Sequence, residues 1–148
     1  MAYANNTQLT AVQPSIVNHG ITDFTAQLTE AEADVKRYIE VNWFNKTYTQ
    51  AFNAVGRRVG PTFDATKLVD AQWQRATIYR ALYAHILPLL SPFAVGGDTF
   101  REMIEHYRNR FVEEMDMEMA QGVQYDGDGD GSIAESETFK QRQERIYR

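Results

Sequence analysis

Residues 69–90 read VDAQWQRATIYRALYAHILPLL, and this stretch decides what fold the rest of the chain can adopt. Its apolar side chains return at steps of three and four residues, which is the spacing of one face of an α-helix. The stripe comprises Trp73, Ala76, either Tyr79 or Arg80, Tyr83, Ile86 and Leu90. A stripe this wide is typical of a central helix that is covered on several sides. We expect Asp70 to cap its start, and Pro88, which lacks an amide hydrogen, to end or kink it.

Two further helices are predicted, one on each side of this stretch. Residues 28–45, LTEAEADVKRYIEVNWFN, carry Val35, Ile39 and Trp43 at steps of four. Residues 99–121, TFREMIEHYRNRFVEEMDMEMAQ, carry an almost straight apolar stripe made of Phe100, Ile104, Tyr107, Phe111, Met115 and Met119. Each begins with a capping-box pattern, Thr29 with Glu32 and Thr99 with Glu102. The other face of residues 99–121 is expected to be solvated, and it holds Arg101, Arg108, Arg110, Glu113, Glu114 and Glu118.

The segments between and beyond these helices are less regular. Residues 1–28 are predicted to be largely irregular, with one short helix near residues 11–18 that has Pro14 in its first turn and Gly20 at its end. Residues 45–67 contain Gly56, Gly60 and Pro61 and are predicted to form a loop or hairpin-like excursion. Arg57 and Arg58 lie at its centre, and either solvation or contact with a partner would explain them.

Together these patterns predict an all-α fold, with a small antiparallel bundle of three main helices. We expect one domain spanning residues 1–148, because this is an ordinary domain length. It would comprise an extended N-terminal segment (1–28), a helical body with a long middle loop (29–121), and a C-terminal arm (122–148) that begins with an EF-hand-like loop. Gly122 is expected to end the third helix.

Composition narrows the classes of function. The net charge is −5, and residues 125–137 alone hold five acids and no base, so the rest of the chain is neutral. A neutral body does not indicate a nucleic-acid-binding protein. The chain has no cysteine, which excludes disulfides and thiolate metal sites. The first ten residues lack the pattern of a signal peptide, and no apolar run is long enough to cross a membrane.

The acidic stretch, YDGDGDGSIAESE at residues 125–137, matches the twelve-position calcium loop. Asp126, Asp128 and Asp130 fall at positions 1, 3 and 5, and Gly131 falls at the sharp turn of position 6. Ser132 at position 7 would offer its carbonyl, and Glu137 at position 12 would offer both carboxylate oxygens. Ca²⁺ is therefore the predicted ion, with Mg²⁺ or another hard cation as the alternative.

The remaining positions of this loop indicate a structural site rather than a sensor. Ile133 at position 8 is expected to point into the core, and Ala134 at position 9 leaves a place for water. Sensor loops come in pairs, and only one loop is present here. We therefore expect a weak structural clip, and a merely solvated acidic turn is the competing interpretation.

No catalytic pattern is visible. His19, His85 and His106 have no metal-ligand spacing, and motifs of nucleophilic or phosphate-binding sites are absent from the sequence. We expect His85 to be a satisfied core or interface histidine, and Met117 to be an apolar residue facing away from the core stripe. The sequence predicts that the protein is not an enzyme.

Three blocks in order resemble the head-to-tail adaptor, or connector, proteins of tailed bacteriophages. They are HGITDFTAQLTEAEADVKRYIEVNWFN, FDATKLVDAQWQRATIYRALYAHILPLLS, and YRNRFVEEMDMEMAQGVQYDGDGDGSIAESE with its arginine-bearing end RIYR. The resemblance covers about residues 18–148 and includes no catalytic motif.

The resemblance implies a structural virion protein. Such adaptors are small helical proteins that form a homo-oligomeric ring, commonly a dodecamer, at the head–tail junction below the portal protein. The ring extends the channel, through which DNA passes without sequence-specific binding, and docks the next neck or tail-completion protein. The competing hypothesis is a single EF-hand-like calcium-binding module with a regulatory or interaction role.

Overall fold

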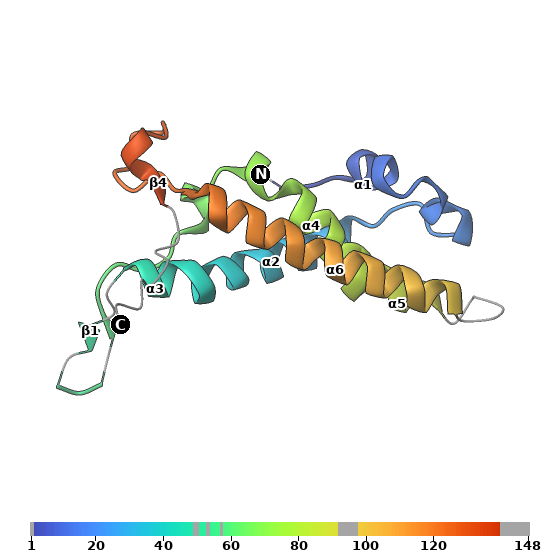
Figure 1. The fold of residues 1–148 in the computed structure, drawn as a ribbon, viewed down its shortest axis with the longest axis horizontal. Helices are drawn as coiled ribbons and strands as arrows, with labels where there is room; N and C mark the ends of the chain where they lie inside the picture. Colours follow the sequence, from blue (N-terminus) through green and yellow to red (C-terminus); the bar gives the residue numbers. More distant parts are fainter. Residues whose placement is uncertain (1, 49–50, 53, 57, 92–97, 140–148) are drawn as a thin grey trace, which may run out of the picture.

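The protein is described by a computed structural model, in which residues 2–48, 51–52, 54–56, 58–91 and 98–139 are placed well enough to describe. The chain is mostly helical, so the predicted all-α class is confirmed at that level. Figure 1 shows an elongated molecule in which the long helix α6, Asp98–Gln121, runs along most of the body. Among the described helices, none combines the length and hydropathy that a membrane crossing requires.

The helices and strands follow one another along the chain with short connections. The N-terminal half holds α1 (Asn6–Val12), the 3-10 helix η1 (Pro14–His19), α2 (Thr25–Ile39), the π-helical segment η2 (Glu40–Phe44) and α3 (Asn45–Thr47). Next come β1 (Ala51–Phe52), β2 (Arg58–Val59), the 3-10 helices η3 (Ala65–Lys67) and η4 (Asp70–Trp73), α4 (Gln74–Arg80), the π-helical segment η5 (Ala81–Ile86) and α5 (Leu87–Leu90). After α6 lie β3 (Val123–Gln124), the 3-10 helix η7 (Glu135–Glu137) and β4 (Thr138–Phe139).

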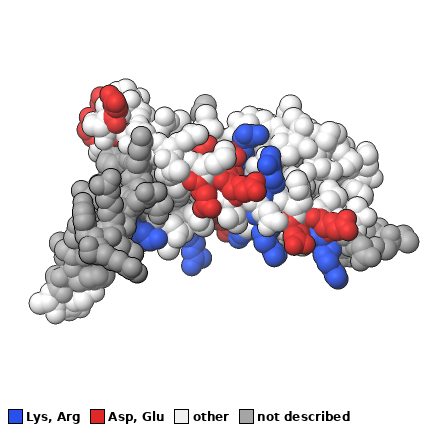
Figure 2. All heavy atoms as spheres, in the orientation of Figure 1, with Lys and Arg blue, Asp and Glu red and all other residues white. Residues whose placement is uncertain are grey.

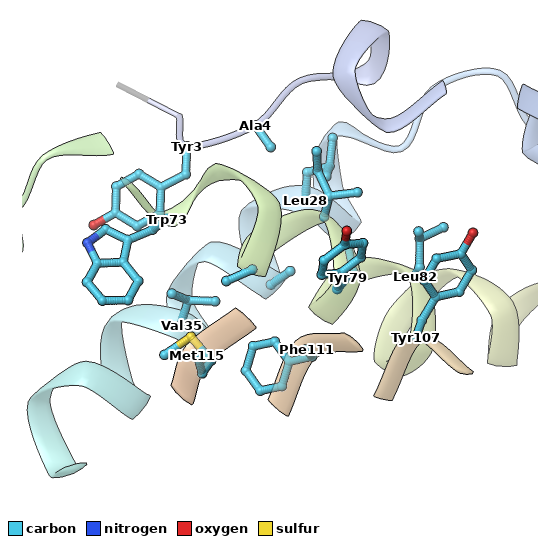
Figure 3. Packing of buried hydrophobic residues seen from close by; sticks show 14 of the residues in the cluster. Tyr3, Ala4, Leu28, Val35, Trp73, Tyr79, Leu82, Tyr107, Phe111 and Met115 are labelled. Carbon is cyan, nitrogen blue, oxygen red and sulfur yellow. The ribbon is translucent and has the colours of Figure 1, made fainter. Parts of the chain in front are cut away.

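The core forms where α2, α4 with η5, and α6 pack against one another. Residues from all three contribute to it, including Val35, Tyr79, Leu82, Phe111 and Met115 in Figure 3. The central segment is the most completely buried, because its wide apolar stripe faces both neighbouring helices. This confirms that residues 69–90 organise the fold.

The N-terminal segment is more ordered than the sequence indicates. Its first 28 residues contain α1, η1 and the start of α2, and they place Leu9, Ile16 and Phe24 in the core. The expected helix at residues 11–18 is therefore wrong in its bounds. Pro14 does open η1, and Gly20 does follow its end with a φ of 88°.

Helix α2 begins four residues before the predicted cap at Thr29. The Asp23 carboxylate accepts hydrogen bonds from the backbone amide and hydroxyl of Thr25, at 3.0 and 2.6 Å. Thr29 lies inside the helix and donates to the carbonyl of Thr25, so the predicted capping box with Glu32 does not form. The carboxylate of Glu32 instead accepts from the backbone amide of Tyr3 at 2.9 Å, which fastens the start of the chain to α2.

The central helix departs from the prediction at both ends. Asp70 opens the 3-10 turn η4 rather than capping an α-helix, and α4 begins at Gln74 without a side-chain cap. Pro88 does not end the helix, which continues to Leu90. The turn before it is widened into the π-helical segment η5, where the amide of Leu87 reaches back to the carbonyl of Leu82. A widened turn gives room for the proline ring that an α-helical turn lacks.

Helix α6 ends at Gln121, and Gly122 follows it with a φ of 116°, so the predicted stop is confirmed. The helix already includes Asp98, ahead of the capping position predicted at Thr99. The predicted solvated face is wrong at Glu114, whose side chain is buried.

The middle excursion is a hairpin, as predicted. Strands β1 and β2 pair antiparallel, with Phe52 opposite Arg58. The hairpin projects from one end of the body (Figure 1), and the exposed turn at its tip holds Val55.

Candidate metal centre

The acidic loop lies between two short strands rather than between two helices. Strands β3 and β4 pair antiparallel, with Val123 opposite Phe139 and Gln124 opposite Thr138. The backbone amide of Tyr125 donates to the carbonyl of Glu137, which closes the loop at 3.2 Å. The centre is therefore a hairpin-closed loop and differs from a helix–loop–helix EF-hand.

A second segment, residues 64–68, holds the base of the loop in place. The amide of Asp126 donates to the carbonyl of Lys67 at 2.9 Å, and Tyr125 forms a bridge with Leu68. The ammonium of Lys67 donates to the carbonyl of Gly127 at 3.3 Å. These contacts join segments about sixty residues apart in sequence, so the first turn of the loop is fixed relative to the body.

Beneath the loop lies a cluster of aromatic rings. Tyr125 is buried and packs against Trp43, Phe44 and Phe63, with ring centroids 5.5 to 6.3 Å apart. Tyr48 completes the cluster at 4.6 Å from Phe44. Aromatic pairs at such separations stabilise a fold beyond the area that they bury. Tyr125 therefore anchors the start of the loop in an aromatic cluster that is built from η2 and the chain that follows it.

The structure brings together three of the predicted ligands. Asp126, Asp128 and Asp130 each place one carboxylate oxygen within 4.8 Å of the others. Backbone amides hold these carboxylates in position. Asp126 accepts from Gly129, Asp130 and Gly131, at 2.7 to 3.1 Å, and Asp128 accepts from Asp130 at 3.0 Å. Three carboxylates so close together repel one another unless a cation lies between them.

The other predicted ligands have a different arrangement. Glu137 is buried, and its two carboxylate oxygens accept from the amides of Asp128 and Ala134, at 3.2 and 2.9 Å. It lies beside the aspartates but outside the group whose oxygens converge. The side chain and amide of Ser132 both donate to Asp130 at 2.8 Å, and these bonds lower the pKa of Asp130 below its usual value.

Ile133 does not point into the core as predicted. It is half-buried and lies outside the hydrophobic cluster, which includes Tyr125 at the start of the loop. Tyr125 anchors the loop instead, because it immediately precedes the loop and packs in the aromatic cluster. The donor set is all oxygen, which suits a hard cation such as Ca²⁺ or Mg²⁺.

A second polar cluster, which sequence analysis missed, joins α2 to the central helix. Asp34 accepts from Arg80 Nε and His85 Nε2, both at 2.9 Å, and the other ring nitrogen of His85 lies 3.2 Å from a Glu30 oxygen. His85 is thus an interface histidine, as expected. The spacing of Glu30 and Asp34, four residues apart on one helix, was the only visible signal. Arg80 and His85 are five apart and would diverge by about 140° on an α-helix.

The other candidate residues remain dispersed. His19 is exposed and meets the ring of Phe100, while His106 is exposed and meets the ring of Tyr107. Met117 faces away from the core, as predicted, and is 52% exposed. Arg57 and the arginine-bearing tail from residue 140 lie outside the described residues, as does the side chain of Arg58.

Comparison with known proteins identifies no relative: no family model matches the chain, and neither a curated protein nor a solved structure is significantly similar to it.

Proposed function

We propose that this chain is a subunit of a ring at the head–tail junction of a tailed bacteriophage, placed between the portal protein and the next neck or tail-completion protein. The proposal rests on the resemblance of the three sequence blocks described above. In it, the three main helices form an antiparallel bundle as the body of each subunit, about twelve subunits make the ring, and DNA passes through the channel. The protein has no catalytic role and resides in the virion.

The structural observation that supports the proposal is the placement of two projecting features at one end of a helical body. The β1–β2 hairpin and the acidic loop lie at the same end and, in Figure 1, extend to opposite sides. A cyclic ring needs two different surfaces on each subunit that fit one another. Projections on opposite sides of one end suit contacts with two different neighbours.

The distribution of charge is compatible with such contacts. In Figure 2 acidic and basic side chains are mixed along the helical body, while the end that carries the acidic loop shows a separate acidic group. A mixed body surface favours specific contacts between subunits over general attraction to DNA. A channel that lets DNA slide also has no use for a strongly basic lining.

Within this proposal the acidic loop is a structural clip for calcium. The aspartates at 126, 128 and 130 would hold the ion, and Glu137 would join them if its carboxylate exchanged its amide donors for the ion. The carbonyl of Ser132 is the remaining predicted ligand. Since β3 and β4 close the loop, the ion would fix the direction in which the chain leaves the body after Phe139.

Analysis of purified virus particles tests the proposal. We expect mass spectrometry to find the chain in particles at a fixed ratio to the portal protein. Electron cryomicroscopy should place a helical ring directly below the portal. Finding the chain only as a free monomer in infected cells, and never in particles, would contradict the proposal.

A calcium-binding regulatory module is the second candidate, and the convergence of the three aspartates favours it. It predicts that affinity for a partner changes steeply at micromolar calcium. The ring proposal instead predicts that calcium affects the loop and leaves the body unchanged. A calcium titration followed by heteronuclear NMR separates the two, because only a switch would shift the signals of α2, α4 and α6 together.

A further inference from the structure

Two glutamates on one side of α6 have no partner within the part of the chain that the structure describes. Glu114 is only 7% exposed, and Glu118, one helical turn later, is half-buried. Residues four apart on a helix share a face, so both carboxylates lie on the same side of α6. Among the described residues, neither carboxylate makes a hydrogen bond or an ion pair. Because a buried carboxylate without a partner is costly, this side of α6 suits a ligand that donates hydrogen bonds.

Glu118 lines a polar cavity of about 370 Å³ at the C-terminal end of α6, where β4 lies beside the helix in Figure 1. The other polar side chains that line this cavity come from Gln121 on α6, Gln124 on β3, Thr138 on β4 and Gln72 on η4. No lysine, arginine or histidine is among the described residues that line it. The negative charge of the cavity is therefore not balanced by its own walls.

Hydrogen bonds between distant segments hold these walls in place. Gln72 Nε2 donates to the carbonyl of Gly122 at 2.9 Å, and Gln72 Oε1 accepts from the amide of Gln124 at 3.1 Å. Gln124 and Thr138 also lie opposite one another in the β3–β4 pair. The cavity is thus formed before any ligand binds, as ligand pockets usually are.

The free groups in the cavity match a guanidinium. Within the described residues, the side chains of Gln121, Gln124 and Thr138 make no hydrogen bond, so their oxygen atoms can accept beside the carboxylate of Glu118. A guanidinium carries five N–H donors and no acceptor, and its planar fork pairs with a carboxylate. A hard metal ion prefers several converging carboxylates, whereas a single carboxylate lines this cavity.

The chain itself carries a basic segment that could supply this group. Residues 140–148 read KQRQERIYR and hold four bases and one acid. A cyclic ring needs two different surfaces on each subunit that fit one another, and an acidic cavity with a basic segment makes such a pair. We propose that the cavity at Glu118 receives an arginine side chain from residues 140–148 of a second copy of this chain, with Glu114 adding negative charge one turn away. This inference rests on the proposed function, because it names a contact between neighbouring subunits of the ring.

Binding of a fluorescently labelled peptide with the sequence of residues 140–148 to the full-length chain, followed by fluorescence anisotropy, tests the inference. We expect the wild-type chain to bind the peptide. Glu118→Gln should weaken binding about tenfold, because one partner of a charged hydrogen bond is lost. Glu114→Gln should weaken it about threefold, the size of effect for a charge that acts without direct contact. A peptide with glutamine in place of its arginines should bind at least about tenfold more weakly.

Glu113→Gln is the matched control, because Glu113 makes the same change beside Glu114 but is 64% exposed and does not line the cavity. It should leave the affinity unchanged. A wild-type chain that binds no added peptide, whether its own last residues fill the cavity or nothing does, would overturn the inference. An affinity that is unchanged in Glu118→Gln, or equally reduced in Glu113→Gln, would overturn it as well.

Urea unfolding separates a binding role from a structural one. Glu114→Gln removes a buried charge that has no partner among the described residues, so the urea midpoint should stay the same or rise while the peptide affinity falls. A lower midpoint would mean that Glu114 supports the fold instead. Since these measurements contain no portal protein, a portal that gains no ring would overturn the ring function and leave the result for the cavity standing.

Discussion

At the scale of single residues, Leu82 and Leu89 differ in how much each is expected to contribute to the free energy of unfolding. They lie seven residues apart on the central helix, yet Leu82 is fully buried in η5 and Leu89 in α5 is 44% exposed. We expect Leu82→Ala to lower the free energy of unfolding by about 2–5 kcal/mol, because it loses buried surface and leaves a cavity. Leu89→Ala should change it by less than about 1 kcal/mol.

Urea unfolding monitored by circular dichroism measures both variants under the same conditions. Two equal losses would mean that η5 does not lie at the centre of the core. Figure 3 labels Leu82 among the buried residues of the core, together with Tyr79 and Tyr107.

Asp23 gives a prediction that depends on pH. Hydrogen bonds from the Thr25 hydroxyl and amide, followed by one from Asn6, lower the pKa of Asp23 to about 2. Because the pKa is lowered on folding, the contribution of Asp23 to stability is present above about pH 4 and is lost as the pH falls toward 2. NMR titration of the carboxylate should therefore give a midpoint near 2.

Thr25→Ala should move that midpoint upward, toward the ordinary value for aspartate, because it removes the strongest of these hydrogen bonds. Thr29→Ala is the control, since the Thr29 hydroxyl bonds to the carbonyl of Thr25 and not to Asp23. An unchanged midpoint in Thr25→Ala would show that the Thr25 hydroxyl does not lower the pKa of Asp23.

At the scale of elements, Gly20 ends η1 in a conformation that other residues rarely adopt. Its φ is 88°, and an added Cβ would meet nothing within 4 Å, so any cost of substitution is backbone strain alone. We expect Gly20→Ala to lower the free energy of unfolding by about 1–2 kcal/mol. Gly127→Ala is the comparison, because an added Cβ there makes only ordinary contacts and should cost under about 0.5 kcal/mol. Similar costs for the two variants in thermal unfolding would exclude strain at Gly20.

The acidic loop provides the prediction for metal binding. With calcium at about tenfold excess over its dissociation constant, binding should stabilise the protein by about 1.4 kcal/mol, and chelation should remove this gain. Asp128→Asn combined with Asp130→Asn should abolish it, because two of the three converging carboxylates are lost. Asp116→Asn, an exposed change on α6, should retain it. Calorimetric melting with and without calcium measures the effect, and identical melting in the wild type would rule out the clip.

Apolar periodicity predicted helix where the structure has α2, α4 with η5, and α6, and Gly20 and Gly122 follow the ends of η1 and α6 as predicted. Helix starts were less predictable. Thr29 is a good capping residue, but α2 begins at Thr25 without a side-chain cap, and Glu32, the expected partner of Thr29, accepts from the backbone amide of Tyr3 instead. The π-helical turn before Pro88 was not predictable either, because it is a response to packing and leaves no periodic pattern.

The candidate site was also predicted only in part, because some of its contacts join segments that are distant in the sequence. The aspartates converge because their spacing along a short loop suffices to bring them together. The anchoring of that loop on Tyr125 and Lys67 depends on contacts between distant segments, which spacing does not encode. The cluster of Asp34 with Arg80 and His85 escaped prediction because it requires the widened turn.

At the scale of the whole molecule, the protein is an elongated helical body with two projections at one end. Each subunit of a ring contacts two neighbouring subunits, and in this proposal it also contacts the portal protein on one side and the next neck protein on the other. A body of mixed charge with projections on opposite sides suits such contacts. The clip would then act on the rigidity of each subunit at the acidic loop.

The central claim, that this chain is a ring subunit, is tested most directly by measuring the mass of the chain mixed with the portal protein of its proposed virus, using mass photometry. The account predicts that the portal gains one ring of about twelve copies of this 17.0 kDa chain, with few partly filled complexes. A portal whose mass is unchanged, beside a chain that remains a 17.0 kDa monomer at every concentration tried, would contradict it.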